Sequence, residues 1–217
     1  MIKKLLLLTS LAGLPFLSVA QTEPASPHFY VGLGANLLTK VPASSAVVPR
    51  LVGPAVTGGL HLGPRLALQA SLSYHWKNES ASYPAYNYGG GTIGGDSYSN
   101  SYKYFMVPVL LRYTFTPPAQ RFHFDGFAGL TVLHSAFHYE STTTSYTGIP
   151  YSTEHSSGQT RAAIALGPAV RYAIAPAVDL TANALVNTVL GDNYSRNFST
   201  RLFLNVLVGA QYSFGQR

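Results

Sequence analysis

The chain has no cysteine and few charged residues, although it runs to 217 residues. The missing cysteine excludes disulfide bonds and thiolate–metal chemistry, so the fold must rely on backbone hydrogen bonds and packing. Charged residues make up 10% of the sequence, whereas about a quarter is usual in soluble domains. Tyrosine and phenylalanine are abundant, with 15 and 11 residues. This composition is unusual for a soluble domain.

Long apolar runs are also scarce, and one stands at the start of the chain. Lys3 and Lys4 precede this run, and Ser-Val-Ala at 18–20 supplies the small side chains that a signal peptidase reads. We therefore expect residues 1–20 to be a secretory signal peptide. A membrane-spanning helix fits less well because the run is short and Pro15 interrupts it. Since no later stretch offers the roughly 20 apolar residues of a spanning helix, the exported chain is either soluble or inserted as a β-barrel.

Positive charge is present but thinly spread. The formal net charge of +6 includes the two lysines of the signal peptide, so the remainder carries +6 − 2 = +4. No run of lysine and arginine forms the basic stripe of a nucleic-acid-binding surface, and nucleic acid is not an expected partner. A mild positive balance could attract the phosphates of lipopolysaccharide, although scattered solvated charge is the simpler explanation.

Residues 65–76, "RLALQASLSYHW", alternate strictly between apolar and small polar side chains. Successive side chains of a β-strand point to opposite faces, so one face is apolar and ends in Tyr74 and Trp76, while the other carries Gln, Ser and His. On a soluble sheet the polar face usually carries Lys and Glu. Small uncharged groups suit a confined lumen, and leucines that end in an aromatic pair suit lipid with an interfacial belt.

Comparable alternating segments recur along the chain and predict eight strands. These cover residues 28–40, 51–63, 65–76, 103–116, 122–140, 159–174, 177–190 and 200–214. Each is long enough to cross a bilayer when tilted, for which about 9–11 residues suffice.

The connections alternate between short turns and long polar loops, the loops being 41–50, 77–102, 141–158 and 191–199. An even number of strands then places both chain ends with the short turns and all four loops on the opposite side. The expected fold is an all-β, eight-stranded, antiparallel up-and-down transmembrane β-barrel over residues 28–217. Residues 21–27 are expected to form a short periplasmic lead.

Five charged residues fall on inward-facing positions of these strands. Counting from the turns pairs Arg171 with Asp179 and Arg112 with Asp125, and the same alternation turns Arg161 inward. Side chains nearly fill the interior of an eight-stranded barrel, so an unpaired charge there would be costly. We predict that the five residues form an ion cluster in the lumen. The alternative is a set of surface pairs on a soluble sandwich.

Glycine-containing segments recur at fixed places: "YVGLGANL" opens the first strand, "FAGLTV" and "ALGPAVRY" lie in the middle, and "VLVGAQYSFG" closes the last. With the signal and the eight long strands, they resemble the small outer-membrane β-barrel domain family of Gram-negative bacteria. That family includes PorT-like proteins and is similar in architecture to the outer-membrane protein A and X barrels. The resemblance covers nearly the whole chain after the signal.

The resemblance implies a location in the bacterial outer membrane, with lipid and lipopolysaccharide as neighbours. It also implies insertion by the barrel-assembly machinery, which reads a terminal aromatic residue in this family. Phe214 matches that position, although Gly215, Gln216 and Arg217 follow it. For PorT-like members the resemblance further implies a partner in a secretion complex.

The loop at 77–102 contains "YNYGGGTIGGDSYS", which lacks the Gly-Lys-Ser/Thr ending and the following helix of a phosphate-binding loop. Tyrosines give it instead an amphipathic surface of the kind used in recognition loops, namely Tyr83, Tyr86, Tyr88, Tyr98 and Tyr102. We predict that this surface contacts an extracellular ligand. The alternative is a loop that packs on itself over the barrel mouth.

Two further patterns suggest metal binding or catalysis. His134 and His138 lie near Glu140, but two interfacial histidines on a strand are a simpler interpretation than a metal site. The segment 155–157, His-Ser-Ser, matches the His-x-Ser motif of eight-stranded lipid A deacylases, with Glu154 or Glu140 as the acid. It falls in an expected polar loop, so we predict no catalytic residue, no metal site and no cofactor.

The function expected from these patterns is structural, adhesive or surface-binding, exerted through the four long loops. Bulk transport is disfavoured because an eight-stranded lumen is too full for an open porin. A lipid A deacylase is the enzymatic alternative. A soluble periplasmic barrel that holds a lipid is the other, but it needs outward-facing charges, which are nearly absent here.

Overall fold

A computed structural model describes the chain at residues 28–41, 50–83, 86–88, 91–93, 95–144, 149–191 and 202–214. The expected signal peptide and the lead at 21–27 lie outside the described residues, as do most of the expected loops 41–50 and 191–199. Within the described ranges, no helix has the length and apolar character needed to cross a membrane.

Eight strands close into an antiparallel barrel in the order β1-β10-β9-β8-β7-β6-β3-β2, and β1 pairs with both β10 and β2. The topology is up-and-down, as the sequence predicted. The barrel strands are β1 (His28–Lys40), β2 (Leu51–His61), β3 (Leu66–Tyr83), β6 (Asp96–Thr114), β7 (Phe122–Thr144), β8 (Pro150–Ala175), β9 (Val178–Val189) and β10 (Leu202–Ser213). A separate two-stranded hairpin, β4 (Tyr86–Tyr88) and β5 (Gly91–Ile93), lies between β3 and β6.

The outer face of the barrel is a band of large apolar side chains that remain nearly half exposed, such as Leu68, Leu72 and Val109. Aromatic rings border this band at both ends. Tyr74 stacks on Trp76 at one end, with ring centroids 5.6 Å apart, and Tyr212 meets Phe214 edge to face at the other, at 4.8 Å. An apolar band between two aromatic girdles matches a lipid environment, whereas a soluble lipid-binding barrel would carry charges here.

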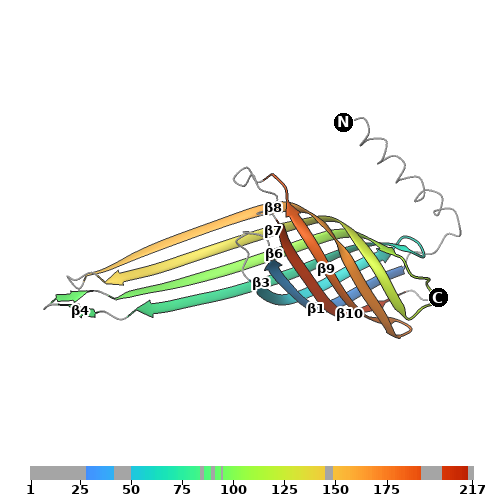
Figure 1. The fold of residues 1–217 in the computed structure, drawn as a ribbon, viewed down its shortest axis with the longest axis horizontal. Coiled ribbons are helices and arrows are strands. Elements are labelled where there is room, and N and C mark those ends of the chain that lie inside the picture. The colour runs from blue at the N-terminus through green and yellow to red at the C-terminus, as the bar shows by residue number, and fades with distance from the viewer. Residues whose placement is uncertain are drawn as a thin grey trace.

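Four neighbouring strands, β3, β6, β7 and β8, continue far past the other four as one sheet (Figure 1). We call this sheet the extension and define it as residues 77–83, 96–102, 137–144 and 150–157, whose register is unbroken. Much of the expected loops 77–102 and 141–158 is therefore strand, which corrects the prediction. These segments are polar, but tyrosine and threonine favour the pleated backbone of a strand. Their alternation with serine and asparagine is therefore compatible with a sheet.

The opposite end of the barrel, the turn end, carries the short connections between β2 and β3, β6 and β7, and β8 and β9. The lumen is filled along its length between this end and the extension. Near the extension it is closed by an apolar plug of Leu38, Leu51, Tyr104, Met106, Leu133, Ala163, Val189 and Phe203. Amides form a layer below, where Asn205 Nδ2 donates to Asn36 Oδ1 at 3.0 Å and Thr131 Oγ1 donates to Asn187 Oδ1 at 2.8 Å. Charged groups occupy the turn end.

The seam between the first and last strands depends on two glycines that face each other, Gly34 and Gly209. A Cβ added to Gly34 would collide with the carbonyl oxygen of Val208, and one added to Gly209 would collide with that of Leu33. The two backbones approach so closely that glycine alone fits on the lumen side. The repeated glycines of the first and last strands therefore serve barrel closure.

Candidate functional site

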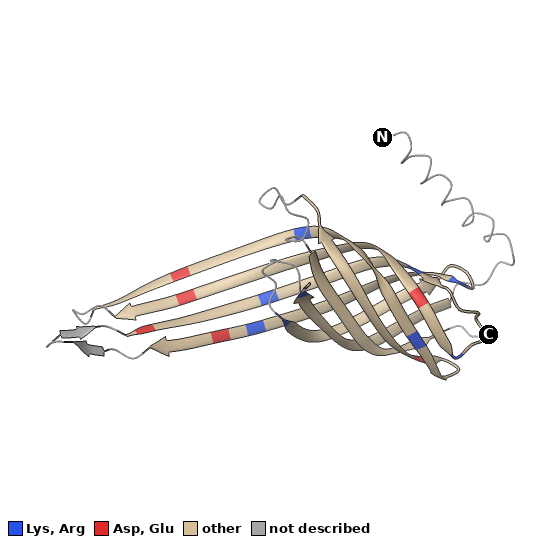
Figure 2. Ribbon diagram, in the orientation of Figure 1, with Lys and Arg blue, Asp and Glu red and all other residues tan. Residues whose placement is uncertain are grey.

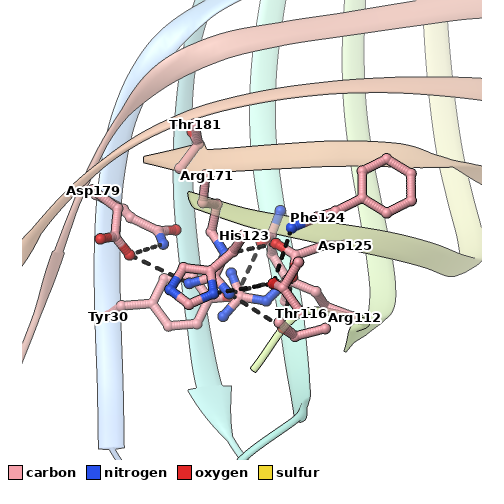
Figure 3. Close-up of polar contacts among 12 residues, drawn as sticks. Tyr30, Arg112, Thr116, His123, Phe124, Asp125, Arg171, Asp179 and Thr181 are labelled. Carbon is pink, nitrogen blue, oxygen red and sulfur yellow. Dashed lines mark hydrogen bonds and ion pairs between the residues drawn. The ribbon is translucent and has the colours of Figure 1, made fainter. Parts of the chain in front are cut away.

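The lumen at the turn end holds a network of charged and polar side chains centred on Arg171 of β8 (Figure 3). Its Nε donates to Asp125 Oδ2 at 2.6 Å and its NH2 donates to Asp125 Oδ1 at 3.2 Å, a two-pronged contact from β8 to β7. Its NH1 lies 3.3 Å from Asp179 Oδ2 on β9. A guanidinium shared between two carboxylates in this way ties three neighbouring strands together.

Neutral side chains complete the bonding of both carboxylates. Thr114 Oγ1 donates to Asp125 Oδ1 at 2.6 Å and accepts from Arg171 NH2 at 3.2 Å. Gln211 Nε2 donates to Asp179 Oδ2 at 3.1 Å, which links the last strand to the network. Asp125 is fully buried, so these bonds replace the water that an exposed carboxylate would have.

Arg112 of β6 is buried in the same lumen, but its contacts are with rings. Its guanidinium carbon lies 4.7 Å from the ring centroid of Tyr30, and its NH2 lies 3.3 Å from His61 Nε2. The Tyr30 hydroxyl donates to Gln69 Oε1 at 3.0 Å. A cation over an aromatic face is stabilised without a carboxylate.

The structure brings Arg112, Asp125, Arg171 and Asp179 into one region of the lumen, but the expected Arg112–Asp125 ion pair is absent from it. The register places Thr114 opposite Asp125 and Phe127 opposite Arg112, so counting from the turn was wrong by two residues.

Arg161 does not belong to the cluster, which corrects a second prediction. It lies ten residues before Arg171 on the same strand, roughly 33 Å away at about 3.3 Å per residue. Its NH2 donates to Gln159 Oε1 at 2.6 Å, at the end of the barrel next to the extension.

Free space in the lumen is small. The cavity that reaches Arg112, Asp125 and Arg171 has a volume of about 20 Å³, enough for about one water molecule. A larger cavity of about 820 Å³ opens only at the turn end, between His28, His61, Arg121 and Phe214, with Arg171 and Asp179 in its wall. The wide cavity of the turn end thus narrows to about one water molecule at the charged network.

The extension is the second candidate site, and its two faces differ in composition. Its inner face, which continues the lumen-facing side of the barrel, carries four aligned residues from each strand. They are Lys77, Glu79, Ala81 and Tyr83 on β3; Asp96, Tyr98, Asn100 and Tyr102 on β6; Phe137, Tyr139, Ser141 and Thr143 on β7; and Tyr151, Thr153, His155 and Ser157 on β8. The outer face carries mainly serine and threonine and no tyrosine, phenylalanine or tryptophan.

Three of the five predicted contact tyrosines, Tyr83, Tyr98 and Tyr102, lie together on this inner face. The ring centroids of Tyr83 and Tyr98 are 6.3 Å apart. A hydrogen bond with Tyr83 raises the pKa of Tyr98. Tyr86 and Tyr88 lie apart from them on β4.

Sequence reasoning missed the three rings that β7 and β8 add to the inner face, Phe137, Tyr139 and Tyr151. Their alternation with small polar residues was visible, but the polar composition of residues 141–158 favoured a loop. Phe137 lies against Tyr102 with ring centroids 5.0 Å apart. The inner face is thus an aromatic surface shared by all four strands.

The residues of the expected deacylase motif lie on the extension with geometry that does not match a catalytic triad. The motif residues His155 and Ser157 both lie on the inner face of β8. The two candidate acids, Glu154 and Glu140, pair with each other on the outer face and are separated from His155 by the sheet. Ser156 Oγ lies 2.9 Å from Nδ1 of His138, and Glu154 Oε1 lies 3.8 Å from that same nitrogen. A triad needs the acid and the nucleophile on different ring nitrogens.

Metal ligands are also not grouped in the described part of the chain, where no set of three or more histidine or acidic side chains could hold an ion. His134 instead bonds through Nδ1 to Thr160 Oγ1 at 2.8 Å, and His138 to Ser156. Strand β7 continues past both histidines to Thr144, so they lie at and beyond the rim of the barrel. Their position beyond the apolar band explains why two histidines come after the apolar residues on the same face of β7.

Comparison with known proteins matched one family model, described as "Outer membrane protein beta-barrel domain", over residues 9–215. One similar structure is that of Ail, the attachment invasion locus protein of Yersinia pestis, in complex with the heparin analogue sucrose octasulfate. Its sequence is 12% identical to this one, and the two structures superpose with a TM-score of 0.51 over 88% of this chain and 100% of Ail. A major outer membrane protein from Thermus thermophilus is 12% identical with a TM-score of 0.50, over 88% and 100% of the two chains. OprG from Pseudomonas aeruginosa is 9% identical with a TM-score of 0.50, over 87% and 96%. These likenesses concern the fold, and the comparison with curated sequences found no match.

Proposed function

Because the chain belongs to the outer membrane protein β-barrel domain family, we propose that its barrel is a sealed anchor in the bacterial outer membrane and that its extension is a binding surface outside the cell. The observation that carries the proposal is the continuation of four strands past the barrel as a sheet with two different faces (Figure 1). A protein that served only as a membrane plug would not need this sheet.

The filled lumen supports an anchor rather than a pore. An apolar plug fills one end of it, and the cavity beside the charged network has room for about one water molecule. Solute transport through the barrel would require both to rearrange. The sheet separates His155 from both candidate acids, Glu154 and Glu140, which also supports a binding protein rather than a deacylase.

The partners that fit this arrangement are of two kinds. Lipid and lipopolysaccharide cover the apolar band, and insertion by the barrel-assembly machinery would read the last strand and Phe214. An extracellular ligand or a secretion-complex partner, which a PorT-like relative would have, would use the extension.

The orientation of the barrel in the membrane is tested by cysteine labelling, which is specific for the introduced residue because the chain has no cysteine of its own. Ser99→Cys, on the exposed outer face of the extension, should react with a membrane-impermeant maleimide on intact cells. Ala119→Cys, in the exposed turn between β6 and β7, should react only after lysis. The reverse pattern would contradict the proposal.

The binding role is tested by shortening both hairpins of the extension. Residues 79–100 and 139–155 are each replaced by Asn-Gly, which closes a tight turn between paired neighbours in each hairpin. The shortened protein should still migrate as a heat-modifiable barrel, while cells that carry it lose adherence that the full chain confers. Unchanged adherence with a folded short barrel would remove the binding role.

A further inference from the structure

The aromatic rings of the extension are all on its inner face. Within the defined strand segments, every tyrosine and phenylalanine falls on that face, namely Tyr83, Tyr98, Tyr102, Phe137, Tyr139 and Tyr151. The outer face has serine at most of the same levels, for example Ser80 beside Ser99. Beyond Tyr102, which packs against the plug, the rings lie outside the barrel, so lumen packing does not account for their placement.

The rings form a platform that is anchored at its base and open at its end. Tyr102 packs against the apolar plug of the barrel and against Phe137. Farther out the rings are more exposed, and Tyr83 and Tyr151 reach 57% and 70%. Tyrosine loses little conformational entropy on binding, because it has only two side-chain torsions, and it offers both an apolar face and a hydroxyl.

Small hydrogen-bonding groups stand beside the rings on neighbouring strands. Tyr98 is level with Ser141, Tyr139 is level with Asn100 and Tyr151 is level with Thr143. A ligand that lies across the strands therefore meets a ring next to a polar group at these levels. This pattern suits a molecule with apolar C–H patches and many hydroxyls.

Few charged residues lie along the extension (Figure 2), and the register places little net charge on its inner face. Lys77 and Glu79 form an ion pair on it and neutralise each other. Asp96 and the ring of His155 are the remaining charged or titratable groups among its aligned residues, tyrosine hydroxyls aside. A sulfated, phosphorylated or strongly acidic ligand would need a group of arginines or lysines, and these sixteen positions do not supply one.

Two residue types that are enriched at protein interfaces are missing from this face, which argues against a protein partner. Neither arginine nor methionine occurs among the sixteen aligned positions. Protein interfaces are enriched in both, together with aromatic residues, and arginine is common among the residues that carry most of the binding energy.

We infer that the inner face of the extension binds an uncharged glycan chain, whose sugar rings stack on the tyrosines and whose hydroxyls bond to the polar groups between them. This inference rests on the proposed function, since it names the ligand of the same surface. The platform is longer than a single sugar ring, because Tyr98 and Tyr102 are four residues apart along one strand, about 13 Å. A chain is thus a better fit than a monosaccharide.

The test uses the full-length barrel in detergent micelles and three neutral polysaccharides, dextran, yeast mannan and galactomannan, with heparin as the sulfated comparison. Affinity is measured by electrophoresis through gels that contain each polysaccharide. At least one neutral polysaccharide should retard the protein more than heparin does. The double variant Tyr98→Ser, Tyr139→Ser should weaken that binding about tenfold or more because two stacking surfaces are lost.

Two matched variants separate stacking from folding. Tyr98→Phe with Tyr139→Phe keeps the rings and should stay within about threefold of the unaltered protein, since each substitution removes only a neutral hydroxyl. Ser99→Ala with Thr142→Ala alters the outer face at neighbouring positions and should leave binding unchanged. Every variant must retain the heat-modifiable band.

Three outcomes would overturn the inference: no neutral polysaccharide binds, heparin binds best, or the serine double variant binds as well as the unaltered protein. Cysteine labelling at Ser99 and the adherence of cells with shortened hairpins are independent of these gels. If those two results hold while no glycan binds, the surface role stands and the glycan assignment fails.

Discussion

The barrel and the extension are built from the same strands but are stabilised differently. In the barrel, β3, β6, β7 and β8 have one face against a filled lumen and the other in an apolar band. In the extension the same strands have no opposing sheet among the described residues, and β8 is exposed on both faces from Pro150 to Thr160. The barrel therefore depends on packing and buried charge, and the extension depends mainly on its hydrogen-bond ladder.

This comparison shows why the two regions tolerate different substitutions. A change in the barrel meets either lipid or a closely packed interior, so few side chains fit. A change in the extension meets water on most sides and costs little unless it breaks the ladder. The extension can therefore vary in sequence and acquire a ligand while the barrel stays the same.

The largest effect is expected for Asp125→Asn, which leaves the buried Arg171 without its two-pronged partner. We expect a loss of about 3–5 kcal/mol in the free energy of unfolding, because the buried guanidinium keeps only its longer contact with Asp179. Urea unfolding in micelles, followed by the heat-modifiable band, measures it. Asp179→Asn is the control: it removes one longer contact, at 3.3 Å, and should cost about 1 kcal/mol. Equal losses for the two variants would mean that Asp125 is not the principal partner.

The next largest effect is a difference in insertion free energy between two positions on the outer face of strand β3. Leu72→Arg places a charge in the apolar band and should cost about 2–4 kcal/mol of insertion free energy. Ser80→Arg, eight residues farther along the same face, should change it by less than about 0.5 kcal/mol, because the side chain is in water. Folding yields into lipid vesicles compare the two. A similar drop for both would place the extension in the membrane as well.

A smaller effect is expected when the hairpin of β3 and β6 alone is shortened, with Asn-Gly in place of residues 79–100. The barrel should lose no more than about 1 kcal/mol, since the removed segment carries no part of the plug or of the charged network. The urea midpoint and the heat-modifiable band report the result. Loss of the folded band would show that the extension nucleates the barrel.

The smallest effect concerns the ion pair of Lys77 with Glu79 on the inner face of the extension, whose side chains are about two-fifths exposed. A double-mutant cycle with Lys77→Gln and Glu79→Gln should give a coupling energy of about 0.2–1 kcal/mol, weakened by salt. The same cycle on Arg171 and Asp125 should give several times more. Comparable coupling energies for the two pairs would mean that charges are screened equally in the lumen and on the extension.

The sequence predicted the barrel better than the extension because the signals differ in strength. Strict alternation of leucine with small polar residues, as at Leu68 and Ser71, marks a strand with one apolar face. In the extension both faces are polar, so Ser97 to Tyr102 resembles a loop by composition even though its tyrosines alternate. Hydropathy alone does not distinguish a two-sided polar strand from a loop.

The charged network was predicted only in part. Four of the five predicted residues lie in it and Arg171 contacts Asp179 as expected, but Arg161 lies elsewhere and Asp125 pairs with Arg171 instead of Arg112. Alternation placed Arg171 and Asp125 in the lumen, yet the partner of each depends on the register across the turn, which sequence does not fix within two residues. The packing of Arg112 on Tyr30 joins β6 to β1, strands that are not neighbours in the sheet. Such contacts across the lumen depend on barrel closure, which no local pattern encodes.

The uninterrupted course of the long strands has a mechanical consequence. Strand β7 runs 23 residues from the turn end to the outer part of the extension, roughly 75 Å at about 3.3 Å per residue. A pull on a ligand held by the extension acts nearly parallel to this strand and its neighbours. Ladder hydrogen bonds lie across the strands, so such a pull shears many of them together instead of opening them one by one. Tension from an attached cell would thus pass directly into the barrel wall, where the apolar band resists extraction from the membrane.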